Sequence, residues 1–253
     1  MYFNGSFSYL RPANVQKNFE GLTGKEIKVA VIDSGWSENL TDSRILKGKG
    51  FVNPEDELTL KISDEVTDQN GHGTGCADLI FRVAPDVKII PLKVFGKEIE
   101  TSINMLEEAF RFAIDSEVDV INVSLGTTLE EALIPIYRLC EEAKQKGIIT
   151  VAAQSNYHNK SYPAVFENVI SVITMSKMEY FQIEKLEDDV NEYAALGAIA
   201  DALNKDGERC FTGGNSFAAP IVSGIVALLK QQNKNINLDE VREVLNKFSE
   251  ESK

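Results

Sequence analysis

The chain has 253 residues, enough for one large α/β domain, and we expect residues 1–253 to form a single domain. Hydrophobic residues make up 43% of the chain and charged residues 26%, proportions typical of a soluble globular protein. The 39 acidic side chains outnumber the 26 basic ones and give a formal net charge of −13. Because an acidic surface repels nucleic-acid phosphates and anionic lipid, neither nucleic acid nor a membrane is expected as a partner.

The cysteines and the start of the chain indicate a compartment. Cys76, Cys140 and Cys210 are an odd set at wide spacings without a CxxC pair, so neither disulfides nor a zinc site are expected. The N-terminal sequence MYFNGSFSYLRPANVQ has no basic start followed by an apolar run, and no stretch is long enough to span a bilayer. We therefore expect a cytoplasmic protein with no signal peptide.

Short apolar runs alternate with helical patterns along the chain. Runs rich in β-branched residues predict buried strands at residues 27–32, 87–95, 118–123, 148–153 and 169–174. This alternation predicts an α/β fold with a mainly parallel sheet and helices on both faces.

Three helices are predicted from apolar spacing. The first carries on one face Ile103, Leu106, Phe110 and Ala113. The second ends at Gly147 and carries on one face Leu129, Leu133, Ile136 and Cys140. The third is expected to begin at Asn237, with Glu240 completing a capping box, and to bury Val241, Val244 and Leu245. Residues 53–70 and 178–192 fit no regular element.

Two residues suited to proton transfer lie early in the chain. Asp33 directly follows the first predicted strand, in VAVIDSG, and the carboxyl ends of parallel strands present functional side chains. Alone, it is more typical of an aspartate that caps a turn with Ser34 and Gly35. His72 lies in NGHGTG, where glycines let the backbone fold tightly around an imidazole, and the only other histidine is His158.

Ser216 lies in GGNSFAAP, just before the apolar run VSGIVALL, which predicts a buried helix. Its hydroxyl is therefore expected near a helix N-terminus, where backbone N–H groups favour developing negative charge. The alternative is a serine that caps the helix. A serine hydroxyl is a weak nucleophile and needs a histidine to take its proton and a carboxylate to orient that histidine.

The three candidates occur in the order Asp, His, Ser, which is the order of subtilisin. VAVIDSG, NGHGTG and GNSFAAP resemble the three signatures of the subtilisin family, whose usual forms are VAVIDTG, HGTHVAG and GTSMASP. The resemblance is collinear from about Leu22 to Leu229. It implies a subtilisin-like fold in which Asp33 orients, His72 acts as general base and then acid, and Ser216 attacks the carbonyl.

Two further segments extend the resemblance. VAAQSN stands in the place of the family's VAAAGN, which implies that Asn156 is an oxyanion donor. VINVSLG resembles the strand that pairs with substrate, and residues 94–101 resemble the opposing strand, so an extended peptide fits better than a simple ester. The substrate-binding residues implied are Ser124, Leu125, Gly126, Thr127, Ile99, Glu100, Leu106, Ser155 and Ser161.

Specificity follows from the same resemblance. Thr127, Ser155 and Ser161 occupy positions that are often glycine around the primary side-chain pocket, so a smaller, more polar pocket is expected. Glu98 and Glu100 lie beside the path of residues upstream of the cut. These carboxylates are either ordinary solvated charges, or they favour substrates with Lys or Arg two to four residues before the scissile bond.

Several residues depart from the family pattern. They are Gly75 for the second histidine of HGTH, Asp78 for a helix glycine, Asn215 for threonine, and Gln154–Ser155 for Ala–Gly. None removes a triad group, but nothing in the sequence names a partner for Asp78. Cys76 matches a free cysteine of the proteinase K branch, or is simply a small buried hydrophobe.

CADLIFRVAPDVKIIPLKVF runs without the insertion that binds calcium in calcium-dependent relatives, so no metal or other cofactor is expected. Met1 lies only 32 residues before Asp33, so no propeptide is expected either. The sequence thus predicts a serine endopeptidase that processes a restricted set of intracellular peptides, similar to lantibiotic leader peptidases. The alternatives are a catalytically silent peptide-binding module and an esterase. The oligomeric state stays open.

Overall fold

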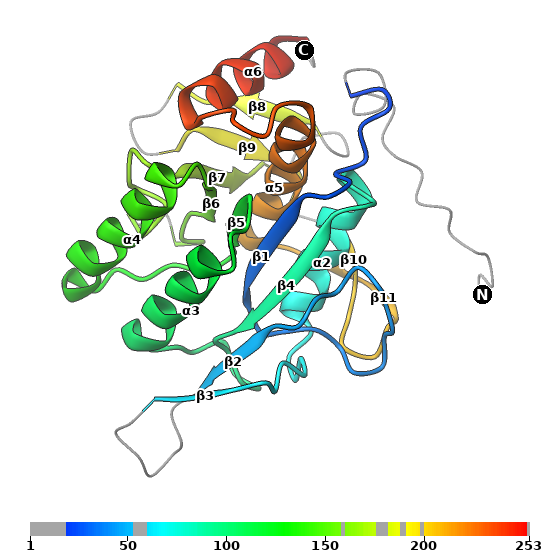
Figure 1. Cartoon of the computed structure of the whole chain (residues 1–253), viewed down its shortest axis with the longest axis vertical. Coiled ribbons are helices and arrows are strands. Elements are labelled where there is room, and N and C mark those ends of the chain that lie inside the picture. Colours follow the sequence, from blue (N-terminus) through cyan, green and yellow to red (C-terminus); the bar gives the residue numbers. More distant parts are fainter. Residues whose placement is uncertain are drawn as a thin grey trace.

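The structure, a computed structural model, describes residues 19–52, 60–157, 160–175, 182–187, 191–197 and 200–251. Within these ranges nine strands form one sheet in the order β3-β2-β4-β1-β5-β6-β7-β9-β8 (Figure 1). Neighbouring strands run parallel except in the outer pairs β2–β3 and β8–β9. The prediction of a mainly parallel sheet is therefore confirmed.

The strands of this sheet, in chain order, are β1 (Lys28–Asp33), β2 (Lys49–Val52), β3 (Lys61–Ser63), β4 (Lys88–Lys93), β5 (Val120–Val123), β6 (Ile149–Ala153), β7 (Ile170–Thr174), β8 (Ile183–Lys185) and β9 (Tyr193–Ala195). A separate hairpin consists of β10 (Ala200–Leu203) and β11 (Arg209–Thr212).

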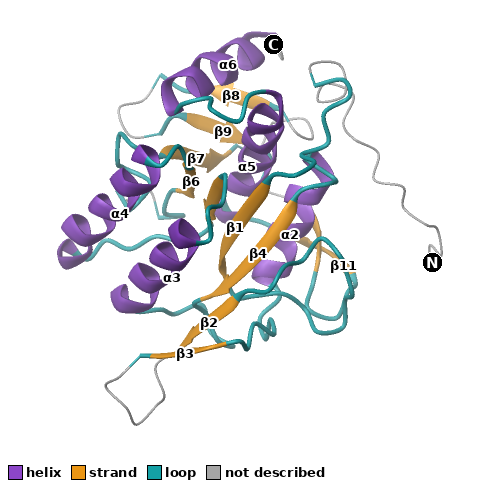
Figure 2. Cartoon of the chain, in the orientation of Figure 1, coloured by secondary structure: helices purple, strands orange, loops and turns teal. Residues whose placement is uncertain are grey.

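Helices cover both faces of the sheet (Figure 2). The helices α2 (His72–Val83), α5 (Asn215–Gln232) and α6 (Leu238–Glu251) enclose one apolar core, and α3 (Ile103–Asp115) and α4 (Leu133–Gln145) enclose the other. Strand β1 contributes to both cores, because Val29 and Val31 point into the first, and Ala30 and Ile32 into the second. Burial on both faces explains why these strands read as continuous apolar runs.

The predicted core strands are all present: four are slightly shorter than their apolar runs, and β1 is shifted by one residue. The prediction for α4 is wrong at its start, since Leu129 and Leu133 are 52% and 39% exposed. Residues 130–132 form a 3-10 turn, so the α-helix begins only at Leu133 and its buried face only at Ile136. The helical spacing was therefore extended one turn too far.

The capping box of α6 is confirmed. The Asn237 side chain accepts hydrogen bonds from the N–H groups of Asp239 and Glu240, both 3.0 Å long. In return, Glu240 Oε2 accepts the Asn237 N–H at 2.9 Å. Val241 and Leu245 are buried, as expected, whereas Val244 is only partly buried against the same core.

Short outer elements were missed. Strand β3 lies in the acidic segment 53–70, of which residues 53–59 lie outside the described ranges, and β8 lies in the charged segment 178–192, of which 178–181 and 188–190 lie outside them. The β10–β11 hairpin had a readable signal, because its loop contains Asp206–Gly207 with φ +78° at the glycine. None of the helices in the described ranges combines the length and apolarity required to cross a membrane.

Candidate active site

Strand β1 lies where the chain changes direction across the sheet, between β4 on one side and β5 on the other. Such a switch point opens a crevice at the carboxyl ends of the strands. Asp33 is the last residue of β1, His72 is the first residue of α2, and Ser216 is the second residue of α5. Three elements far apart in the sequence therefore bring the three candidate catalytic residues to this crevice.

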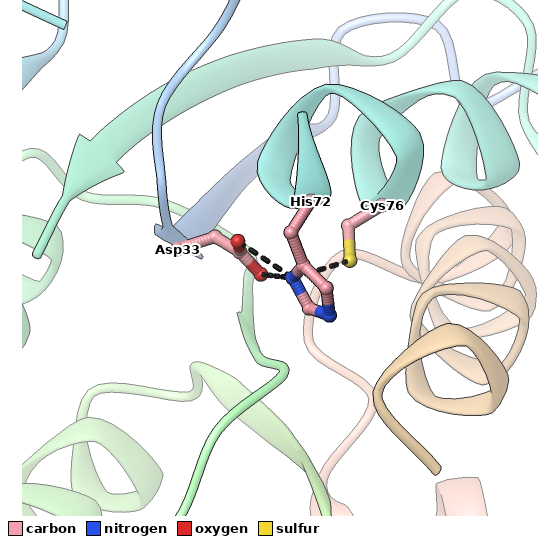
Figure 3. Close-up of side chains that lie close together, drawn as sticks. All are labelled: Asp33, His72 and Cys76. Atoms are coloured by element: carbon pink, nitrogen blue, oxygen red, sulfur yellow. Dashed lines mark hydrogen bonds and ion pairs between the residues drawn. The ribbon is translucent and has the colours of Figure 1, made fainter. Parts of the chain in front are cut away.

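Hydrogen bonds connect these residues in one chain. His72 Nδ1 lies 2.8 and 2.9 Å from the two carboxylate oxygens of Asp33, which is fully buried (Figure 3). Because a carboxylate only accepts, Nδ1 carries the proton, which leaves Nε2 as an acceptor. The Ser216 hydroxyl lies 2.8 Å from that Nε2. The arrangement fits proton transfer from Ser216 to His72.

The charge of Asp33 sets the basicity of His72. Burial opposes a charge on the imidazole, but the attraction of the Asp33 carboxylate outweighs it and places the pKa of His72 well above its usual value. A stabilised imidazolium is what a general base must become when it removes a hydroxyl proton.

Cys76 lies one helical turn after His72, with its sulfur 3.8 Å from His72 Nδ1 (Figure 3). Burial, followed by the charge of Asp33, raises the pKa of this thiol to about 11, so it stays protonated and is a poor nucleophile. Among the described residues, Asp33, His72 and Cys76 are also the one group of three potential metal ligands within 4.8 Å. A metal there would have to ionise the thiol and displace the Asp33–His72 bond.

The start of α2 depends on a residue that sequence reasoning missed. Gly71, the N-cap, has φ 101° and no side chain to offer. Asp68 replaces that cap, accepting the N–H groups of Gly71 at 2.6 Å and Thr74 at 2.9 Å. Ser34, next to Asp33, accepts the Gly73 N–H at 2.8 Å. An aspartate just before a glycine-led helix is a readable capping signal, and here it holds His72 in place.

Ser216 is not a helix cap, because the N-cap of α5 is Gly214 and no side chain caps it. Asn156, the expected oxyanion donor, lies beside it. Its Oδ1 accepts the Asn215 N–H at 2.9 Å. A Cβ placed on Gly214 would lie 3.4 Å from Asn156 Nδ2 and 3.5 Å from Ser216 Oγ, so both groups border the same space.

A cleft of about 1330 Å³ contains the site. Its lining includes His72, Ser216 and Asn156, together with all the substrate-binding residues expected from the sequence: Ser124, Leu125, Gly126, Thr127, Ile99, Glu100, Leu106, Ser155 and Ser161. Glu98 is exposed and is not part of the lining. Phe95, Ile99, Glu100 and Thr101 line the cleft from residues 94–101, which form a loop, so the expectation of a second regular strand there is wrong.

Part of the cleft lining is a cluster of hydrogen-bonded polar side chains. Gln154 Oε1 accepts the N–H groups of Ser155 and Ser161, at 3.1 and 2.8 Å, and the Ser161 hydroxyl. A Cβ added to Gly126 would lie only 2.9 Å from Ser161 Oγ, so the Ser161 side chain fills the space beside this glycine. The smaller, more polar pocket stays a prediction. The part played by Gln154 was not foreseen.

The structure supplies the missing partners of Asp78. Arg209 on β11 approaches both carboxylate oxygens, at 3.2 and 3.4 Å, and Arg82 approaches one of them at 3.3 Å. Burial raises the pKa of Asp78 to about 6, although Arg82 opposes the shift. The pairing fixes the β10–β11 hairpin to α2. Sequence spacing gave no sign of it, since Arg209 lies 131 residues away.

We expect calcium to contribute little to stability. Helix α2 is continuous, and only residues 84–87 separate it from β4. Adding a chelator should lower the melting temperature by less than about 2 °C. In a chain of this size, such a shift corresponds to a change of at most about 1 kcal/mol in the free energy of unfolding. Differential scanning calorimetry with and without added calcium measures this. A larger loss that calcium restores would show an ion site elsewhere, for instance in the acidic segment 56–65.

Comparisons with known proteins agree with this geometry. Residues 24–251 match the Subtilase family. The chain is 28% identical over 251 residues to the minor extracellular protease Epr of Bacillus subtilis (strain 168), covering 94% of this chain and 37% of Epr. It is 30% identical over 236 residues to the major intracellular serine protease of the same organism, covering 83% of this chain and 70% of the relative. The chain thus spans little more than a third of the length of Epr.

Solved structures share the fold. A cold adapted subtilisin-like serine proteinase superposes with a TM-score of 0.74 at 22% identity, over 90% of this chain and 83% of that one. The epidermin leader peptide processing serine protease (EpiP) from Staphylococcus aureus superposes with a TM-score of 0.69 at 21% identity, over 88% and 68% of the two chains. With a family match that spans residues 24–251 and this fold, the chain belongs to the subtilase family.

Proposed function

We propose that this protein is a serine endopeptidase that cleaves peptides through an acyl-enzyme intermediate. The observation that carries the proposal is the hydrogen-bond chain from Asp33 through His72 to Ser216, on the border of a cleft of about 1330 Å³. Membership of the subtilase family supports it.

In the proposed reaction, His72 Nε2 takes the Ser216 proton as Oγ attacks the scissile carbonyl carbon. Asp33 stabilises the imidazolium that forms. The carbonyl oxygen becomes an oxyanion, which accepts a hydrogen bond from Asn156 Nδ2. His72 then gives its proton to the leaving amine, and a water molecule repeats the sequence on the acyl-enzyme to release the acid and restore Ser216.

An active-site serine probe tests the proposal against its rivals. We expect a fluorophosphonate to label Ser216 of the wild-type protein at a one-to-one ratio, and a peptide anilide to be turned over. A silent peptide-binding module would bind peptides without labelling. An esterase would hydrolyse a short-chain ester and leave the anilide intact.

For the substrates, we propose a restricted set of intracellular peptides or proteins. The thiols of Cys76, Cys140 and Cys210, of which Cys210 is exposed, fit a reducing cytoplasm. The similarity in fold to a leader peptide processing protease makes ribosomally made precursor peptides a reasonable first substrate class. Comparing cleavage sites in cell extracts treated with wild type or Ser216→Ala tests this, because broad digestion would argue against restriction.

The smaller, more polar pocket expected from Thr127, Ser155 and Ser161 predicts selectivity at the residue before the cut. We expect peptides with Ala or Ser at that position to be cleaved faster than those with Phe or Tyr. Each excess methylene costs roughly 1–3 kcal/mol, so the result should be a preference and not full exclusion. Values of kcat/KM for a matched anilide series measure it. Ser161→Gly should increase kcat/KM for the peptides with Phe or Tyr at that position. Ser116→Gly, at the end of α3, is the control and should leave the preference unchanged. Dominant wild-type cleavage after Phe or Tyr would refute the smaller, more polar pocket.

A further inference from the structure

Asn215 directly precedes the candidate nucleophile, and both the oxygen and the nitrogen of its side-chain amide are hydrogen-bonded. It is only 8% exposed. Its Oδ1 accepts the Thr174 N–H at 2.9 Å, and its Nδ2 donates to the carbonyl oxygens of Gln154 and Ser155, both at 3.0 Å. A single amide therefore connects the start of α5 to the end of β7 and to the segment that follows β6.

The same residue also contacts the expected oxyanion donor. The Asn215 backbone N–H donates to Asn156 Oδ1 at 2.9 Å. With Oδ1 occupied by this bond, the orientation of the Asn156 amide is fixed, and its Nδ2 borders the space beside Gly214 that Ser216 Oγ also borders. Asn215 thus holds Asn156 in two ways: it binds the carbonyls of the two preceding residues, and it binds the amide itself.

The side-chain chemistry at this position is demanding. Two carbonyls and one N–H must be satisfied at once, which requires two donor hydrogens and one acceptor. An asparagine amide provides these, whereas the threonine usual in the family has one donor hydrogen. Asn215 therefore makes two donations at once, of which a threonine could make only one, and it makes them to the segment where Gln154–Ser155 also depart from the family pattern.

We propose that Asn215 is a positioning residue for catalysis: it acts through Asn156, holding that amide where it donates to the oxyanion. This inference rests on the proposed endopeptidase function. Because the oxyanion exists only in the transition state, misplacing its donor lowers kcat and leaves substrate affinity nearly unchanged. A purely structural clamp would instead lower stability, with equal effects whether or not Asn156 is present.

A double-mutant cycle tests the proposal. Asn215→Thr and Asn215→Asp are each made in wild type and in Asn156→Ala, and kcat and KM are measured per active site titrated with the serine probe. Removing one oxyanion donor costs about 10²–10³-fold in kcat, so we expect that loss for Asn156→Ala and about 10–100-fold for the Asn215 variants. In the Asn156→Ala background, the Asn215 substitutions should cost less than about threefold, since the group that they misplace is gone.

Asn168→Asp is the matched control, because Asn168 is also buried but lies before the amino end of β7, at the opposite edge of the sheet. It should leave kcat per titrated site unchanged. The inference would be overturned if the Asn215 substitutions lowered kcat equally in wild type and in Asn156→Ala. It would also be overturned if they raised KM and left kcat constant. If Asn215→Asp fails to fold, Asn215→Thr decides alone. A wild-type protein that neither labels nor cleaves would defeat the proposed function instead, which separates the two failures.

Discussion

Ser216→Ala should abolish peptide hydrolysis, lowering kcat by about 10⁶-fold, because the nucleophile is removed and triad residues act as a unit. His72→Ala should lose nearly as much, and the double variant should lose little more than either single variant. Anilide turnover, measured by progress curves, gives these values. The fold should survive in Ser216→Ala, since the hydroxyl does not cap α5 and its bond is to His72.

The matched control uses the only other histidine. His158→Ala should keep wild-type turnover, and circular dichroism melts should show that both histidine variants are folded. A His72→Ala protein with wild-type turnover would refute the assignment of the general base. Ser216→Ala with unchanged turnover would refute the whole triad. Loss of activity in His158→Ala alone would move the base to that residue.

Asp33→Asn should lower kcat about 10⁴-fold, because an amide donates where the carboxylate accepts and so favours the wrong tautomer of His72. The pH dependence gives a second readout. In the wild type, His72 must be neutral to accept the proton, and Asp33 holds its pKa well above the usual value. Activity should therefore rise with pH through and above the neutral range.

Without the Asp33 charge, burial, which lowers the pKa of His72, is no longer opposed by the strongest of the influences that raise it. The acid limb of the kcat/KM profile should then move to lower pH in Asp33→Asn, even though the plateau is much lower. Asp119→Asn is the control, since Asp119 is also buried but lies just before the amino end of β5. An Asp33→Asn protein with an unshifted acid limb would show that Asp33 does not set the basicity of His72.

The features that the sequence predicted correctly are local ones. Buried parallel strands appear as continuous apolar runs, and the α6 capping box involves only Asn237 and residues within one turn of it. Asp33, His72 and Ser216 each stand in a short motif whose glycines and position beside a strand or helix are visible without coordinates. Even so, the motifs alone gave no distances. Only the structure shows that Asp33 lies within 3 Å of His72, and that His72 lies within 3 Å of Ser216.

Outer elements were less readable, for physical reasons. Strands β3 and β8 contain three residues each and take their conformation from pairing with β2 and β9, so neither has a period of its own. The opposite error occurred at α4, where Leu129 and Leu133 continue the helical spacing but lie outside the buried face. The spacing of apolar residues in the sequence does not show whether another element packs against them in the fold.

The sequence by itself thus determined the fold class, the order of the core elements and the identity of the candidate catalytic residues. Only the tertiary structure decided how the departures from the family pattern are accommodated. Asp78 meets Arg209 across 131 residues, and Asn215 meets Gln154 across 61. The reason is that a buried polar group must find partners, but the fold and not the local sequence decides which residues come within hydrogen-bond distance.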